Sequence, residues 1–317
     1  MATRDPNILV VGYNAFDVVV PVTGFPQPDT KELVEGIMVG GGGPGATAAV
    51  ALSKLGARVR LITLLTDDLP GQMQRQELER AGVDLSLCRE APGEKCPKAV
   101  ILVDSNREER TIFWSRGGLP FLDSGFVDPD WLDGVDLLYC DGHECPVATR
   151  LARSARERNL PVVMDAGSVR EGSRELVALC TDVISSEHFA PELTGKNDPV
   201  EALVALTALG PNRVGMTFGK EGVLTLVEGR PVAVPAFDVP VTDTTGAGDA
   251  FHAGYAFARV GELPLPQCLE FGAAVAALKC RDWGGRRGLP DRGEVEELIR
   301  CGLRLSLGTR LVRATEL

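Results

Sequence analysis

The stretch DTTGAGDAFHAGY, residues 243–255, places a turn of small residues directly before an apolar segment. Phe251, Tyr255 and Ala258 recur at the spacing of one helix face, so the pattern predicts a helix that begins near Asp249. Small residues at a helix start leave backbone N–H groups free at the positive end of the helix dipole. The stretch therefore predicts a site for an anion such as the terminal phosphate of a nucleotide.

An aspartate stands beside this predicted anion site. Phosphoryl transfer requires donors that stabilise the transferred oxygens and a group that accepts the proton of the attacking hydroxyl. The backbone amides of Gly246, Ala247 and Gly248 can supply the donors of such an anion hole, and the Asp249 carboxylate can act as the catalytic base. The alternative is that Asp249 only caps a helix after an ordinary turn, because aspartate is a preferred capping residue.

The rest of the chain alternates between β-prone and helical patterns. Beyond residue 135, strands are predicted at 135–140, 161–165, 182–185 and 213–218, and helices at 147–158, 174–180, 199–208 and 265–279. This order predicts an α/β fold with a mostly parallel sheet and helices on both faces. Because no repeat or linker divides the chain, residues 1–317 are expected to form a single domain.

Two earlier regions predict a smaller sheet beside this core. Residues 7–20 and 31–39 are rich in β-formers, and a polar turn joins the β-prone runs 99–104 and 110–114 into a hairpin. Between these regions, a glycine run at 40–45 precedes a small-residue helix predicted over 46–55. The small sheet is expected to use residues from about 12–40 and 98–116.

Composition excludes several classes of function. The 33 basic and 44 acidic residues give a net charge of −11, which disfavours broad binding to nucleic acid or an anionic membrane. No apolar run reaches the roughly 18–20 residues of a membrane span, and the N-terminus enters a strand without a leader, so the cytoplasm is the expected location. The eight cysteines lack C-x-x-C spacing, which predicts reduced and mostly buried thiols.

Asp-Thr-Thr-Gly-Ala-Gly-Asp-Ala-Phe at 243–251 resembles the C-terminal signature of the ribokinase-like (PfkB) carbohydrate kinases. Gly42 and Gly43, followed by a small-residue helix ending near Leu55, resemble the N-terminal signature. The resemblance extends nearly from end to end. It implies a central α/β sheet with a small β lid, and ATP-dependent phosphorylation of a hydroxyl on a small sugar or sugar derivative such as a ketose, sugar acid or sulfosugar.

The resemblance also assigns roles to residues of this chain. It implies Asp249 as the catalytic base and Gly246, Ala247 and Gly248 as the anion hole. The implied substrate-binding residues are Asp17, Lys31, Gly42, Gly43, Thr47 and His143, and the implied ATP-binding residues are Thr217, Gly219 and Gly222. An ordinary β-turn is the alternative for residues 217–222.

Two departures from the family pattern affect the predicted ligands. Thr47 stands where the family commonly has an asparagine, and residues 185–189 read SSEHF where an Asn-x-x-Glu is expected near the magnesium–phosphate site. Glu187 is therefore a weak metal candidate, and a solvated loop acid is its alternative. The resemblance implies ATP and Mg²⁺, with a monovalent cation as a further candidate.

Residues 43–50 and 276–291 resemble most the sulfofructose kinases within the family. Those enzymes carry a lysine in the lid, and Lys31 matches it. The alternative is that Lys31 is an ordinary surface lysine. No arginine occurs at 141–144, where a second cationic contact is expected, and His143 could replace it or be a simple loop residue. A homodimer that covers the edges of the lid strands is also expected.

Other functions stay open or are disfavoured. There are two alternatives. One is a nucleoside kinase on the same fold, which the low aromatic content of 5% weakens. The other is a non-catalytic sugar-binding relative, which the retention of Asp249 weakens. Gly41-x-Gly43-x-x-Ala46 lies too far along the chain for a dinucleotide fingerprint after a first strand. The chain has no Gly-Lys-Ser/Thr and therefore lacks the P-loop signature.

Overall fold

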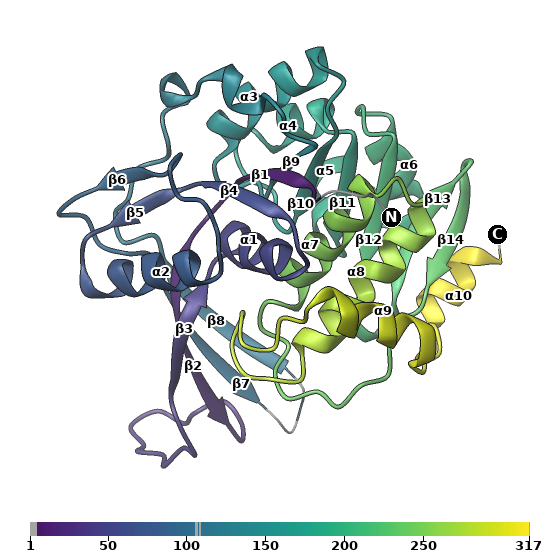
Figure 1. The fold of residues 1–317 in the computed structure, drawn as a ribbon. Coiled ribbons are helices and arrows are strands. Elements are labelled where there is room, and N and C mark those ends of the chain that lie inside the picture. Colours follow the sequence, from purple (N-terminus) through teal and green to yellow (C-terminus); the bar gives the residue numbers. More distant parts are fainter. Residues whose placement is uncertain (1–4, 105–106, 108, 317) are drawn as a thin grey trace.

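A computed structural model describes residues 5–104, 107 and 109–316, and Figure 1 shows their arrangement. The central sheet has eight strands in the order β14-β13-β12-β11-β10-β9-β1-β4. The strands from β4 to β12 pair in parallel, and β13 and β14 add antiparallel strands at one edge. Their bounds are β1 Asn7–Val11, β4 Arg58–Ile62, β9 Leu137–Cys140, β10 Val162–Ala166, β11 Asp182–Ser186, β12 Arg213–Thr217, β13 Val223–Val227 and β14 Arg230–Val234. The predicted mostly parallel sheet is confirmed.

Helices cover both faces of this sheet. The ten helices of the described residues are α1 Pro44–Lys54, α2 Leu69–Arg80, α3 Cys145–Glu157, α4 Ser173–Leu179, α5 Phe189–Thr194, α6 Pro199–Thr207, α7 Ala247–Val260, α8 Leu265–Lys279, α9 Arg292–Cys301 and α10 Thr309–Thr315. Ile8 and Val10 of β1 join the core beneath α1, α7 and α8, whereas Leu9 and Val11 join the core beneath α3 to α6. Because successive strand residues point to opposite faces, β1 is buried on both sides.

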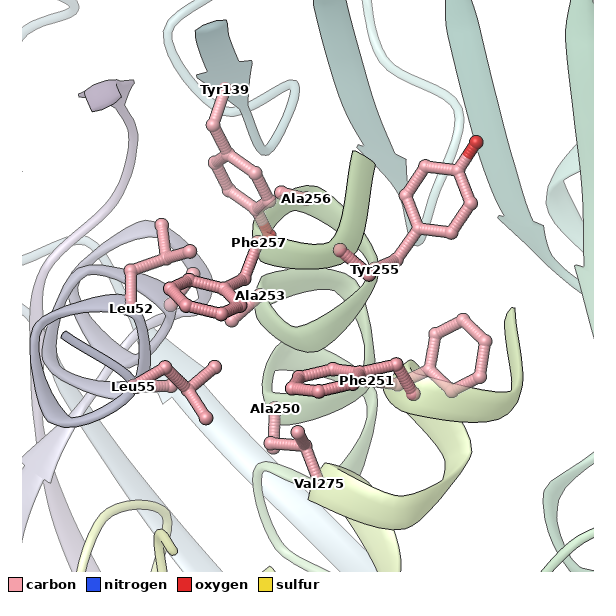
Figure 2. Close-up of a cluster of buried hydrophobic side chains, with 14 of the residues drawn as sticks. Leu52, Leu55, Tyr139, Ala250, Phe251, Ala253, Tyr255, Ala256, Phe257 and Val275 are labelled. Atoms are coloured by element: carbon pink, nitrogen blue, oxygen red, sulfur yellow. The ribbon is translucent and has the colours of Figure 1, made fainter. Parts of the chain in front are cut away.

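Helix α7 lies deep in the first of these cores, as Figure 2 shows. Its residues from Ala250 to Ala258 are all buried, and Phe257 stacks on Phe271 of α8 with ring centroids 5.8 Å apart. Gly254 allows α8 to approach, because a Cβ there would lie 3.0 Å from the Cα of Gly272. The core therefore holds the start of α7 in a fixed position.

A second sheet of four strands, ordered β3-β2-β7-β8, extends from one side of the central sheet (Figure 1). Its strands are β2 Ala15–Val22, β3 Met38–Gly42, β7 Lys98–Asp104 and β8 Glu109–Ser115. Val19, Ala99, Ile101 and Val103 form a small buried cluster on its inner face, with Trp283 packed against it. Strands β5 Leu64–Thr66 and β6 Arg89–Ala91 form a separate short pair.

Several elements differ from the sequence predictions. The strand predicted over 31–39 is wrong for most of its length, because pairing with β2 ends at the Val19–Met38 pair and Leu33 is fully exposed. Helix α7 begins at Ala247, which puts Asp249 in its first turn rather than at its start. The short helices α5 and α10 were not predicted, since six or seven residues give little periodic signal.

Candidate active site

Asp249 lies in the first turn of α7, directly after the turn of small residues. Gly246 caps the helix with φ 74°, a left-handed conformation that favours glycine. A Cβ on Gly246 would also lie 2.8 Å from the Cα of Gly285, so a side chain has no room there. The Ala247 N–H donates to the Thr244 carbonyl oxygen at 3.1 Å, which leaves the Gly246 and Gly248 amides at this helix start for an anion near Asp249.

Asp243, at the start of the signature stretch, holds this turn in place. The buried Asp243 carboxylate accepts hydrogen bonds from the Thr245 N–H at 2.8 Å and from the Gly284 N–H at 2.8 Å. The buried Lys279 ammonium donates to the Asp243 carbonyl oxygen at 2.9 Å. Sequence reasoning assigned no role to Asp243 or Lys279, because their contacts join segments about forty residues apart.

The environment of Asp249 brings the pKa of its carboxyl group close to neutral pH. Burial and the nearby Asp165 raise the pKa of Asp249 to about 7, although His252 and Arg110 act in the opposite direction. Asp165 accepts a hydrogen bond from the Tyr139 hydroxyl at 3.2 Å, and burial raises its pKa to about 8. A carboxylate with a pKa near the working pH is well suited to accept a proton.

His252 connects the base to its surroundings from the next turn of α7. Its Nδ1 lies 2.6 Å from the Gly248 carbonyl oxygen and 3.4 Å from Asp165 Oδ1, and its Nε2 lies 3.1 Å from the Ile184 carbonyl oxygen. These contacts tie the start of α7 to β10 and β11. His252 therefore restrains the backbone of the predicted anion hole.

Asp17 lies on the inner face of the small sheet, next to a cavity of about 140 Å³. The cavity is lined by Asp17, Val19, Met38, Val39, Gly40, Gly41, Glu77, Trp283, Gly284, Gly285, Arg286 and Arg287. The Asp17 carboxylate packs against Gly42, because a Cβ on Gly42 would lie 2.0 Å from Asp17 Oδ2. Burial raises the pKa of Asp17 to about 7, and Arg286 opposes this shift.

Arg286 joins several of the predicted substrate-binding residues, although the sequence did not mark it. Its buried guanidinium donates to the Gly42 carbonyl oxygen at 2.6 Å and to Thr47 Oγ1 at 3.4 Å. Gly43, with φ 82°, precedes α1 between these two contacts. Gly42, Gly43 and Thr47 thus lie together beside Asp17. Lys31 lies apart from them, exposed in the segment between β2 and β3.

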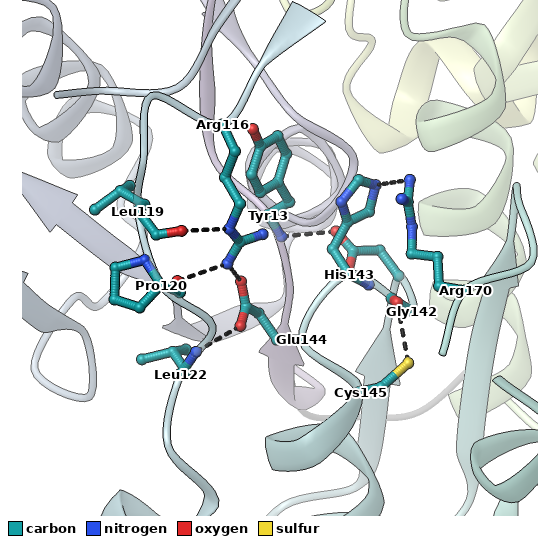
Figure 3. Close-up of polar contacts among 11 residues, drawn as sticks. Tyr13, Arg116, Leu119, Pro120, Leu122, Gly142, His143, Glu144, Cys145 and Arg170 are labelled. Carbon is teal, nitrogen blue, oxygen red and sulfur yellow. Dashed lines mark hydrogen bonds and ion pairs between the residues drawn. The ribbon is translucent and has the colours of Figure 1, made fainter. Parts of the chain in front are cut away.

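His143, labelled in Figure 3, lies in the loop at the carboxyl end of β9. The Asp141 carboxylate fixes this loop. Asp141 accepts hydrogen bonds from the backbone N–H groups of Tyr13 at 2.7 Å, Gly45 at 2.8 Å and His143 at 2.9 Å. These bonds connect the loop to the start of α1, which carries the glycines beside Asp17. Ligands of open α/β sheets bind at this edge.

The residues predicted for ATP lie around the end of β12. The Thr217 hydroxyl donates to the Ser185 carbonyl oxygen at 3.3 Å, and Gly219 and Gly222 flank a single 3₁₀ turn. Glu187 forms an ion pair with Arg310 at 2.9 Å. Its carboxylate is therefore already engaged, which disfavours Glu187 as a direct metal ligand. Among the residues described, no three His, Cys, Asp or Glu side chains form a metal-binding group.

The sequence matches the pfkB carbohydrate kinase family over residues 5–292. The chain belongs to this family. The kinase is 26% identical to a nucleoside kinase of Methanothermobacter thermautotrophicus over 297 residues, covering 92% of this chain and 95% of the relative. It is 28% identical to the ribokinase of Bacillus subtilis over 297 residues, covering 92% and 99% of the two chains.

Solved structures confirm the ribokinase-like fold of the kinase. A candidate ribokinase from Agrobacterium tumefaciens superposes with a TM-score of 0.85 and 27% identity, covering 93% of this chain and 98% of that one. Arabidopsis thaliana ribokinase, solved with ribose and ATP, superposes with a TM-score of 0.78 and 24% identity, covering 94% and 100%. The family match and the ribokinase relative identify the chain as an ATP-dependent kinase, as its sequence predicts.

The finer resemblance to sulfofructose kinases receives no support from these relatives, which are ribokinases and a nucleoside kinase. Motifs shared along a family report common descent as well as common substrate, so the short matches at 43–50 and 276–291 were too weak to select one subgroup. No helix in the described part of the chain combines the length and apolar character needed to cross a bilayer.

Proposed function

We propose that this kinase transfers the γ-phosphoryl group of ATP to a hydroxyl of a small sugar, with Asp249 as the catalytic base. The observation that carries the proposal is the Asp249 carboxyl group, with its pKa raised to about 7, in the first turn of the helix whose amides follow Gly246. N–H groups and a base at one helix start suit a site where phosphate and acceptor meet.

Each group has a defined part in the transfer. Asp17 accepts hydrogen bonds from acceptor hydroxyls in the cavity that it lines with Gly40 and Gly41, which orients the attacking oxygen. Asp249 takes the proton of that oxygen as the new O–P bond forms and the bond to the ADP oxygen breaks. The amides of Gly246 and Gly248 stabilise the charge on the transferred oxygens, whereas the Ala247 N–H holds the turn through the Thr244 carbonyl oxygen.

The nucleotide is proposed to lie along the end of β12, near Thr217, Gly219 and Gly222. The family pattern at these positions and the exposed turn between the two glycines support this placement. Magnesium that arrives with ATP is bound mainly by phosphate oxygens and water, so it needs few protein ligands. It would neutralise phosphate charge, and no step of the mechanism is assigned to Glu187.

Two other properties are proposed on structural grounds. Val39, Val100 and Phe113 share the outer face of the small sheet and are 43%, 41% and 54% exposed, which supports a homodimer that buries this face.

The second property is the cellular location. All eight cysteines are free thiols, which is typical of proteins in the reducing cytoplasm and supports that location.

A nucleoside acceptor is the second candidate, since a nucleoside kinase is among the relatives. A nucleobase would need an open aromatic face near the acceptor site. Tyr13 does not offer one, because His143 stacks on its ring at 4.6 Å and the Arg116 guanidinium lies 5.4 Å from its centroid. Figure 3 shows these two residues on opposite sides of Tyr13. Trp114, which shares the inner face with Asp17, is 55% exposed but has the Arg170 guanidinium 5.8 Å from its ring centroid, so we favour a sugar.

The test is an ADP-release assay over neutral sugars, sugar acids, sugar phosphates and nucleosides, with the parent and with Asp249→Asn. The parent should phosphorylate at least one sugar, and the variant should lose at least about a hundredfold in kcat while it binds ATP normally. An Asp249→Asn variant that keeps its kcat within a few-fold of the parent would refute the assignment of the base.

A further inference from the structure

A cluster of aromatic and cationic side chains lies where the small sheet meets the carboxyl ends of β9 and β10. It consists of Tyr13, Trp114, Arg116, His143 and Arg170. The Arg170 guanidinium lies 5.8 Å from the Trp114 ring centroid, and its Nη2 lies 3.0 Å from His143 Nε2. Only His143 of this cluster was predicted as a site residue, because the two arginines come from distant loops.

The two arginines of the cluster differ in what they bind. Arg116 forms an ion pair with the buried Glu144 and donates to the carbonyl oxygens of Leu119 and Pro120 at 2.9 Å each (Figure 3). Its charge and donors are satisfied within the protein. Arg170 forms no ion pair with any carboxylate of the described residues, and its side chain has only His143 as a hydrogen-bond partner there.

The contact between Arg170 and His143 fixes which group donates. Arginine can only donate, so His143 Nε2 accepts and its ring is neutral, with the proton on Nδ1. Burial and the two nearby arginines lower the pKa of His143, although Asp141 opposes them, which agrees with the neutral form. One N–H group of the Arg170 guanidinium is therefore bound to His143. The other N–H groups of this half-buried guanidinium are available to a ligand.

The small sheet places this charge within reach of an acceptor bound to Asp17. Asp17 pairs with Ala99, and Ala99 pairs with Trp114, so the three side chains share one row of the inner face. The strands of Asp17 and Trp114 are about 10 Å apart, because neighbouring strands lie about 4.8 Å apart. Ala99 between them is buried, whereas Trp114 is 55% exposed, so the end of the row beside Arg170 is open to an acceptor.

We propose that Arg170, positioned by His143 and Trp114, binds an oxyanion on the acceptor, so that the substrate is a sugar carrying a carboxylate, sulfonate or phosphate group. The proposal rests on the proposed kinase function and names its substrate class. The guanidinium fork suits an oxyanion because it offers parallel N–H donors. The acceptor would extend from Asp17, which holds its hydroxyls, to Arg170, which holds its charged end.

The experiment compares matched acceptors on the parent, Arg170→Gln and Arg170→Lys. Ribose serves as the neutral acceptor, ribonate and gluconate as carboxylates, and ribose 5-phosphate as the phosphate. We expect the parent to prefer a charged acceptor over ribose. Arg170→Gln should raise the KM for that charged acceptor about ten- to a hundredfold. The KM for ribose should change less than twofold. Arg170→Lys should recover part of the loss, because it restores charge without the fork.

A matched control is Arg153→Gln on α3, whose exposed side chain pairs with Glu175 away from the cluster. It should leave every KM unchanged. A parent that prefers ribose, or an Arg170→Gln variant that weakens ribose and the charged acceptors equally, would overturn the proposal.

Calorimetric binding separates failure of this proposal from failure of the kinase function. If no acceptor is phosphorylated, the proposed function fails; binding of ribonate or ribose 5-phosphate that Arg170→Gln abolishes would still support the anion subsite. Absence of binding by every charged acceptor would overturn the subsite, even if ribose is phosphorylated. The carboxylate and phosphate probes show which oxyanion is bound.

Discussion

The Asp17 carboxylate fills the space that a side chain on Gly42 would need. A Cβ at Gly42 would lie 2.0 Å from Asp17 Oδ2 and 2.2 Å from its carboxyl carbon. The two residues come from adjacent antiparallel strands, β2 and β3. The orientation of Asp17 toward the cavity therefore depends on the absence of a side chain at residue 42.

Gly42→Ala should displace the Asp17 carboxylate and raise the KM for the acceptor at least about tenfold, because a misplaced hydrogen-bonding group loses most of its contribution. The KM for ATP should change little. Gly36→Ala is the matched control, since its Cβ would meet only the Met38 sulfur at an ordinary 3.7 Å. Equal changes in both Michaelis constants would point to general disruption of the lid instead.

The pH dependence of kcat/KM should report the ionisation of Asp249. The carboxylate form accepts the proton, and with the pKa of Asp249 raised to about 7, the group is mostly protonated below that pH. Activity should therefore rise with pH and level off above about 8. Asp17 has a similarly raised pKa, so Asp17→Asn serves to isolate the contribution of Asp249. A rate that is constant between pH 5 and 8 would contradict this role.

Asp17 should also make the fold less stable as pH rises. Its folded pKa of about 7 lies above the ordinary 3.8, so the folded state holds a proton that the unfolded state has released between these values. The free energy of unfolding should fall from about pH 4 to pH 7, and Asp17→Asn should reduce that fall by about 1 kcal/mol or more. Urea unfolding at pH 5 and pH 8 measures the change in the free energy of unfolding between the two pH values. The same change in parent and variant would exclude the effect.

Lys31→Ala tests whether the lid contributes a charge to substrate binding. If Lys31 closes over an anionic group, its loss should raise the KM of a sugar acid about ten- to a hundredfold and leave a neutral sugar nearly unchanged. Glu32→Ala, which alters the adjacent exposed residue, is the control. Equal effects on both sugars would mean that Lys31 only supports the lid.

The outer face of the small sheet should hold two subunits together. Val100 and Phe113 are directly opposed on β7 and β8, so a charge at either position would be buried in the dimer without a partner. Phe113→Glu should convert a dimer to a monomer, as measured by light scattering at micromolar concentration. Thr111→Glu, farther along β8, should weaken it less. A parent that is already monomeric would refute the proposed interface.

The sequence predicts the parts of this site whose signal is local. The start of α7 is recognisable because glycines and Asp249 precede a regular apolar pattern within a few residues. Arg170, Arg286 and Asp243 act through contacts with segments that lie far away in the chain, and no short pattern announces such contacts. The failed strand at 31–39 has the same cause, because β-pairing depends on a partner strand that the segment itself does not specify.

Strand β8 touches both ends of the acceptor site. Its Arg110 donates to the Thr244 hydroxyl at 3.0 Å, next to the turn that begins α7, and Trp114 lies against His143 on the same face. The two residues are four apart on one strand, or about 13 Å. Because both residues lie on one strand, we expect contact between the acceptor and Trp114 to hold Arg110 at the phosphate turn, where the structure already places it. Movement of the strand away from that turn would admit water to the γ-phosphate, so a bound acceptor should keep wasteful hydrolysis of ATP slow.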